Sequence, residues 1–220
     1  MPSRVDVKER RDGGAKPITD ADSLAQGWPP LHELNERCLD LLARMAGGTA
    51  SNSAPELIQV LRGALHTMRP EARHRAAASP FLLLDLGFCD SAWWSAVKND
   101  ASCRWQARGH RDFFAKRPAI ALTRALLMLA WHQVRSDPNA AVVSMGISLD
   151  CAHIIRSLRF SQIDQIAEHQ YARLRPRWED KPIIWTRLLS CCATDDRESL
   201  RDLHIHAIQL LSGELVTHLR

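Results

Sequence analysis

Apolar residues recur at helical spacing along most of the chain. In "PPLHELNERCLDLLARMAGG", residues 29–48, they fall every three or four positions before two glycines, which predicts a helix ending near Gly47. The same period appears in residues 53–68, 118–137, 148–158, 161–171, 182–192 and 194–220. No segment shows the alternation of apolar and polar residues that is typical of a half-buried strand. The pattern therefore predicts an all-α protein, a multi-helix bundle.

Residues 118–137, "PAIALTRALLMLAWHQVRSD", form the strongest predicted helix, because apolar residues surround it almost completely, as in a buried helix. Asp90, Ser148 and Ser161 stand where N-caps are expected for the helices that follow them. The apolar run "PFLLLDLGF", residues 80–88, resembles a strand, but no partner strand lies nearby in the sequence. We expect a helical turn there, closed by Gly87.

The chain divides by composition into three parts. Residues 1–27 are polar and charged and show no period, which predicts a disordered tail. Residues 28–116 form an N-terminal helical region, and residues 117–220 form a second helical region that contains the strongest helix. The length allows one domain with a sizeable core or two small ones.

Charge and cysteine content narrow the class of protein. The chain has 220 residues, with 29 Lys and Arg against 25 Asp and Glu, so a polyanionic partner is permitted but not required. Its six cysteines contain no CxxC pair, which fits a reducing compartment. The longest apolar run, Ala125–Trp131, is far too short for a membrane span, and the N-terminus has no signal-peptide pattern. We expect a cytoplasmic protein with no membrane contact.

Recognisable catalytic motifs are missing from the sequence. It contains no nucleophile elbow, no phosphate-binding glycine loop and no HExxH motif. The closest histidines, His204 and His206, are two residues apart and point to different faces of a helix. We therefore expect no enzyme, no cofactor and no bound metal.

Tryptophan is unusually frequent, with seven residues against one tyrosine. These rings either fill gaps between helices or anchor a protein interface, where Trp and Arg are enriched. The residues expected at such an interface are Trp93, Trp94, Trp131, Trp178 and Trp185.

Basic residues gather between positions 156 and 187. The predicted DNA-binding residues are Arg156, Arg159, Arg173, Arg175, Arg177, Lys181 and Arg187. In the extended "RLRPR" segment, residues 173–177, alternation would place three arginines on one side, as a track of phosphate contacts requires. A solvated basic surface remains the alternative.

The stretch "MGISLDCAHIIRSLRFSQIDQIAEHQ", residues 145–170, carries the spacing GI(S/N)…A…L…Q…(L/I)AE. With a preceding apolar helix and an aromatic-basic close, residues 127–180 resemble FlhD, a subunit of the bacterial flagellar master transcriptional activator. The residues that carry this resemblance are Leu127, Leu129, Ala130, Asp137, Gly146, Ile147, Ala152, Leu158, Gln162, Ile166, Ala167, Glu168, Arg177 and Trp178.

The resemblance implies an oligomeric helical protein that joins an FlhC subunit, binds promoter DNA and recruits RNA polymerase. Related pairs control transfer genes of mobile elements. It also implies a pair of helices in residues 148–171 that is similar to a helix-turn-helix. The chain departs from the family in two ways: the cysteine that can link protomers falls at Leu174, and more than a hundred residues precede the similar region.

Two functions follow from these observations. The first is a DNA-binding transcriptional activator subunit with an FlhC-like partner. The second is a protein-binding adaptor or anti-activator without direct DNA contact. The first is favoured if the arginines converge on one exposed surface, and the second if they are dispersed or paired with Asp and Glu.

Overall fold

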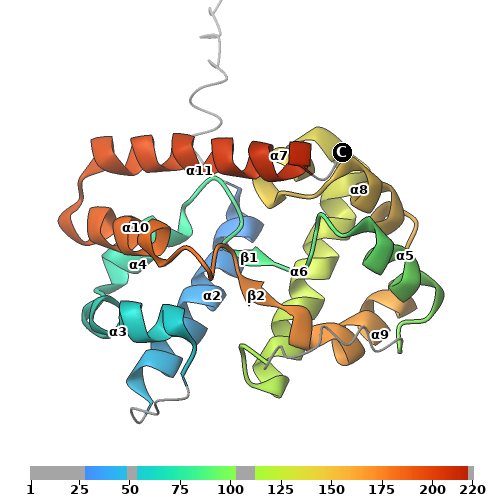
Figure 1. Cartoon of the computed structure of the whole chain (residues 1–220), viewed down its shortest axis with the longest axis horizontal. Helices are drawn as coiled ribbons and strands as arrows, with labels where there is room; N and C mark the ends of the chain where they lie inside the picture. The colour runs from blue at the N-terminus through green and yellow to red at the C-terminus, as the bar shows by residue number, and fades with distance from the viewer. Residues whose placement is uncertain (1–27, 49–53, 103–111, 218–220) are drawn as a thin grey trace, which may run out of the picture.

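The computed structural model describes residues 28–48, 54–102 and 112–217. The predicted disordered tail lies outside these ranges. Within them the chain is mainly α-helical, which confirms the predicted fold class, and its elements are drawn in Figure 1. In chain order they are α2 (Pro29–Gly47), α3 (Glu56–Thr67), α4 (Pro70–Ala77), β1 (Leu84–Asp85), α5 (Ser91–Asn99), α6 (Lys116–Ser136), α7 (Pro138–Met145), α8 (Leu149–Arg156), α9 (Phe160–Gln170), the 3₁₀ turn η1 (Tyr171–Arg173), β2 (Arg175–Pro176), α10 (Pro182–Thr194) and α11 (Arg197–Thr217).

The helices form two groups on either side of a short central ribbon (Figure 1). In one group α10 packs against α3 and α4, which also surround α2. In the other, α6 contacts α7, α8 and α9, while α5 packs on α8. Helices α2 and α6 contact each other, and α11 runs across both groups, from α10 to α7. Helix α6 is therefore central, as its apolar pattern predicts.

Short polar residues begin several helices. The Asp90 carboxylate accepts a hydrogen bond from the backbone N–H of Trp93, and the Ser148 hydroxyl accepts one from that of Cys151. These contacts satisfy donors that the first turn leaves free, and they confirm two predicted caps. The predicted cap Ser161 is wrong, because α9 begins at Phe160.

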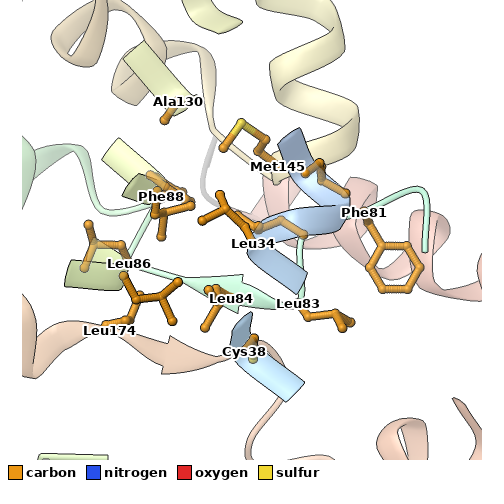
Figure 2. Close-up of a cluster of buried hydrophobic side chains, with 14 of the residues drawn as sticks. Leu34, Cys38, Phe81, Leu83, Leu84, Leu86, Phe88, Ala130, Met145 and Leu174 are labelled. Carbon is orange, nitrogen blue, oxygen red and sulfur yellow. The ribbon is translucent and has the colours of Figure 1, made fainter. Parts of the chain in front are cut away.

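The prediction of a helical turn at residues 80–88 is wrong. This segment is extended, and β1 pairs antiparallel with β2, with Leu84 opposite Pro176 and Asp85 opposite Arg175. Its leucine and phenylalanine side chains are buried among α2, α7 and Leu174, as Figure 2 shows. A local pattern could not reveal this pairing, because the partner strand lies inside the distant basic segment. We call Phe81–Asp90 the strap.

The strap joins the two expected regions into one core. Asn35 of α2, which is fully buried, donates hydrogen bonds to the carbonyls of Ala77 and Phe81 and accepts one from the N–H of Leu83. On the other side, the N–H of Leu82 donates to the carbonyl of Ser144 in α7. The buried apolar cluster contains residues from both sides of position 117.

Among the described residues, no single helix has the length and apolar composition needed to cross a membrane. Helices α7 and α8 taken together have the required length and apolar composition, but the chain bends by 120° between them.

Candidate nucleic-acid interface

The seven basic residues predicted to bind DNA fall into two sets. Four of them line a cleft of about 640 Å³ between the strap, β2 and the end of α11, and three are exposed elsewhere. The cleft set comprises Arg173, Arg175, Arg177 and Lys181, and the exposed set comprises Arg156, Arg159 and Arg187. The structure therefore does not bring all seven together.

Arg177 lies inside the fold rather than on a phosphate-binding surface. Only 4% of it is exposed, and its guanidinium donates to the carbonyls of Leu82, Leu84 and Met145 at 3.0, 3.2 and 2.7 Å. Gly146, with φ of +64°, leaves the space that this guanidinium needs, because a Cβ atom there would lie 2.7 Å from Arg177 Nη1. The prediction of an exposed DNA contact at Arg177 is wrong, since the side chain connects the strap to α7.

Arg173 is held by both charge and an aromatic ring. Its Nη2 lies 2.5 Å from Asp90 Oδ2, and its guanidinium stacks over the Trp93 ring at 4.3 Å. Gly87, with φ of +70°, passes directly beneath it, since a Cβ atom at this position would lie 2.6 Å from Arg173 Nε. Arg173 is therefore paired with the strap.

The remaining cleft cations also face carboxylates. Arg175 Nη1 lies 3.5 Å from Glu179 Oε2, and Lys181 Nζ lies 3.8 Å from Glu214 Oε1. The cleft wall contains five carboxylates, Asp85, Asp90, Glu179, Asp180 and Glu214, against four cations. As folded, this surface does not offer the predicted run of unpaired arginines on one side of a loop.

Four of the five predicted interface tryptophans are buried. Trp93, Trp94, Trp178 and Trp185 are at most 6% exposed. Three of their indole N–H groups donate within the chain: Trp94 to the Gly87 carbonyl, Trp185 to the Arg177 carbonyl and Trp178 to Glu214 Oε1. These four rings fill the core, so the prediction that they form an exposed interface is corrected. Of the five, Trp131 is the one that is partly exposed.

Trp131 organises the turn between α8 and α9. Its indole N–H donates to the Leu158 carbonyl at 2.9 Å. Arg135, one helical turn further along α6, stacks over the Trp131 ring at 4.0 Å and donates to the Arg156 carbonyl at 3.2 and 3.1 Å. Because the last carbonyls of a helix carry partial negative charge, a guanidinium there stabilises the end of α8.

Three exposed arginines and an exposed aromatic ring gather at this turn, one of the arginines reaching it from α6. Arg135, Arg156 and Arg159 are exposed, and 60% of Phe160 is exposed. None of these guanidinium groups forms an ion pair within the part of the chain that the structure describes. We call these four residues the turn cluster. Arg135 and Phe160 were missed from the sequence, although the Trp131–Arg135 spacing of four residues on one helix is a usable signal.

Helices α8 and α9 each pack against α6 more than against each other. Helix α8 packs on α5, α6 and α7, and α9 packs on α6 and η1. Arg124 of α6 binds Asp164 at 2.6 Å, which fixes α9. Arg187 lies on α10, in the opposite helix group, and is therefore separated from the turn cluster (Figure 1).

The described residues contain no group of three or more His, Cys, Asp or Glu that could hold a metal ion. Burial raises the pKa of the Cys89 thiol to about 11, and of Cys151 and Cys192 to about 12. These thiols are therefore protonated at neutral pH and are poor nucleophiles.

Comparison with known proteins finds a similarity in the C-terminal part of the chain. Residues 121–217 match the model of the FlhD family, the flagellar transcriptional activator. This confirms the resemblance noted in the sequence and extends it to α10 and α11, while the strap lies outside the matched range. No curated protein and no solved structure matches.

Proposed function

From the FlhD-like nature of residues 121–217, we propose that this protein is a DNA-binding subunit of a transcriptional activator. It acts in the cytoplasm with an FlhC-like partner subunit, in a homo- or hetero-oligomer, to switch on flagellar or mobile-element transfer promoters through RNA polymerase. The family match supports the activator role, and the turn cluster supports the contact with DNA.

The main support for DNA contact is that the arginines of the turn cluster form no ion pairs in the described structure. Arg156 and Arg159 flank the turn between α8 and α9, Arg135 reaches the same turn from α6, and none of the three forms an ion pair in the described structure. Arginine binds phosphate oxygens with two hydrogen bonds, so such a cluster suits a nucleic-acid backbone. The turn cluster therefore replaces residues 173–177 as the proposed phosphate contact.

The environment of the turn cluster favours a fixed binding geometry. Arg135 binds the last carbonyl of α8 and Trp131 binds a carbonyl of the turn itself, so the turn does not have to be ordered when DNA binds. Phosphate contacts position a protein on a duplex but carry no base sequence directly. We therefore propose that sequence preference comes from the remaining exposed residues of α8 and α9 and from the partner.

The test uses the full chain with its partner and the double variant Arg156→Ala/Arg159→Ala. We expect weaker binding to promoter and random duplexes alike. The log–log salt slope should fall by about 0.9 for each phosphate group that the variant no longer binds. Fluorescence anisotropy at several salt concentrations measures both quantities.

The matched control is Arg69→Ala/Arg201→Ala, which removes two exposed arginines, one immediately before α4 and one on α11. It should leave the slope unchanged, which separates local phosphate binding from a general loss of charge. Equal affinity and slope in wild type and the Arg156/Arg159 variant would contradict DNA contact at this turn.

The second candidate function is a protein-binding adaptor or anti-activator. The cleft favours this function, because its arginines are paired with carboxylates and are therefore less available to phosphate groups. An exposed phenylalanine beside arginines is also typical of protein interfaces. Retained partner binding without any DNA binding by the wild-type complex would support this alternative.

A further inference from the structure

Helix α9 has two faces that are bound to the rest of the fold. Its apolar face is buried and packs on α6 and η1. A second face carries Asp164 and Glu168, whose carboxylate oxygens lie 2.6 and 3.4 Å from Arg124 of α6. The negative charge of this face is therefore matched by a guanidinium group within the same chain.

The third face of α9 carries Ser161, Gln165 and His169, which are all exposed. Residues four positions apart lie on one side of an α-helix, so these side chains form a single line, which extends over about 12 Å along the helix axis. We call these three residues the outer line of α9. It begins beside Arg159 and Phe160, so it continues directly from the turn cluster.

The outer line has free hydrogen-bonding capacity. Neighbouring Gln162 is used within the fold, since its Nε2 donates to the Lys98 carbonyl at 2.9 Å and its Oε1 accepts from the Arg159 N–H at 2.8 Å. The Gln165 side chain, in contrast, forms no hydrogen bond within the part of the chain that the structure describes. His169 Nδ1 donates to the Gln165 backbone carbonyl at 2.8 Å, which leaves its Nε2 as an acceptor.

This chemistry suits base edges better than a protein surface. The centres of protein interfaces are enriched in aromatic side chains and depleted in serine, whereas the outer line contains no apolar residue. The amide group of a glutamine matches N6 and N7 of adenine with two hydrogen bonds in the major groove, which is about 12 Å wide and admits an α-helix. A line of about 12 Å covers roughly three steps of 3.4 Å between base pairs.

We infer that the outer line of α9 lies in the major groove of the DNA duplex and determines sequence preference, with Gln165 as the residue that recognises adenine. This inference rests on the proposed function, because the turn cluster would bring the outer line to the duplex by binding the flanking phosphate groups. Phosphate contacts fix the position of a protein on DNA, and base contacts select the sequence.

The test uses the full-length chain with its partner and two probes: a duplex selected by this complex from a randomised library, and a random-sequence duplex. Gln165→Ala should lower affinity for the selected duplex by about tenfold or more. Affinity for the random duplex and the salt slope should stay unchanged, because no phosphate contact is removed. Alanine favours helix and Gln165 is exposed, so the variant retains α9. Fluorescence anisotropy measures these quantities.

A second arm tests the contact at the level of atoms. Each adenine of the selected duplex is replaced in turn by 7-deazaadenine, in which a carbon atom takes the place of the N7 acceptor. One replacement should weaken binding of the wild-type complex several-fold and leave binding of the Gln165→Ala complex unchanged, because the glutamine amide is the donor to N7. Equal losses in the two complexes at every adenine would overturn the inference.

The matched control is Gln59→Ala, which removes an exposed glutamine from α3 in the opposite helix group. It should discriminate between the two duplexes as wild type does, and an equal loss of discrimination in this control would overturn the inference.

The Arg156→Ala/Arg159→Ala variant separates this inference from the proposed function. If it weakens binding to both duplexes while Gln165→Ala discriminates between them as wild type does, the inference fails and the proposed function stands. If it retains the affinity and slope of wild type, or if the wild-type complex binds neither duplex, both fail.

Discussion

At the residue scale, Arg177 shows how context decides the role of a charged side chain. In the sequence it belongs to an alternating basic run that is typical of a phosphate-binding loop. In the structure it is buried and donates to three backbone carbonyls from the strap and α7. Those carbonyls belong to segments distant in sequence, so no local pattern could have revealed them.

Removal of this side chain should strongly destabilise the protein. Arg177→Ala leaves the carbonyls of Leu82, Leu84 and Met145 without these donors. We expect a loss of about 3 kcal/mol or more in the free energy of unfolding, measured by urea denaturation of the full chain. The exposed residue Arg187 is the control, where alanine should change stability by less than about 0.5 kcal/mol. Similar values for the two variants would show that Arg177 does not connect the strap to α7.

At the element scale, the helices were predicted well, whereas the strand pairing was not. The helices α2, α6 and α8 follow from apolar periodicity and from capping or terminating residues such as Gly48 and Ser148, which act within a few positions of each other. The strap and β2 form a strand pair only because tertiary contacts bury both of them. The turn cluster was predicted only in part, because the contact between Arg135 and α8 depends on the packing of α6.

Helix α11 contributes a pH dependence through His204. Burial lowers the pKa of His204 to about 4, and its ring lies edge-on to Phe81 of the strap. In the unfolded chain the pKa of this histidine returns to its ordinary value of 6.5, so the unfolded chain binds the proton more readily than the folded chain. Stability contributed by neutral His204 should be complete above pH 6.5 and be lost as the pH falls towards 4.

Thermal unfolding of wild type and His204→Gln between about pH 7 and pH 4 measures this effect. The melting temperature of wild type should fall more steeply across that range than that of the variant. The control is His206→Gln, because His206 is exposed on the same helix and should leave the wild-type slope unchanged. Parallel profiles for wild type and His204→Gln would exclude His204 as the source of acid sensitivity.

At the scale of the whole molecule, the FlhD-like part does not form its core alone. The family match covers residues 121–217, yet α10 packs on α3 and α4, and the strap fills the space between α2 and α7. The N-terminal residues thus bury surfaces of the FlhD-like part and supply two of the cleft carboxylates. The turn cluster lies outside the cleft, on the turn between α8 and α9, and this leaves it available for a macromolecular partner.

Site-specific photo-crosslinking tests most directly whether the turn cluster contacts DNA. A photoreactive phenylalanine replaces Phe160, beside Arg159, or Ile183 on α10, since these side chains are similarly exposed, at 60% and 65%. In the complex with an FlhC-like partner and promoter DNA, we expect DNA cross-links from position 160 and none from position 183. Cross-links from position 160 to the partner protein alone, or equal DNA cross-linking from both positions, would contradict DNA binding through the turn between α8 and α9.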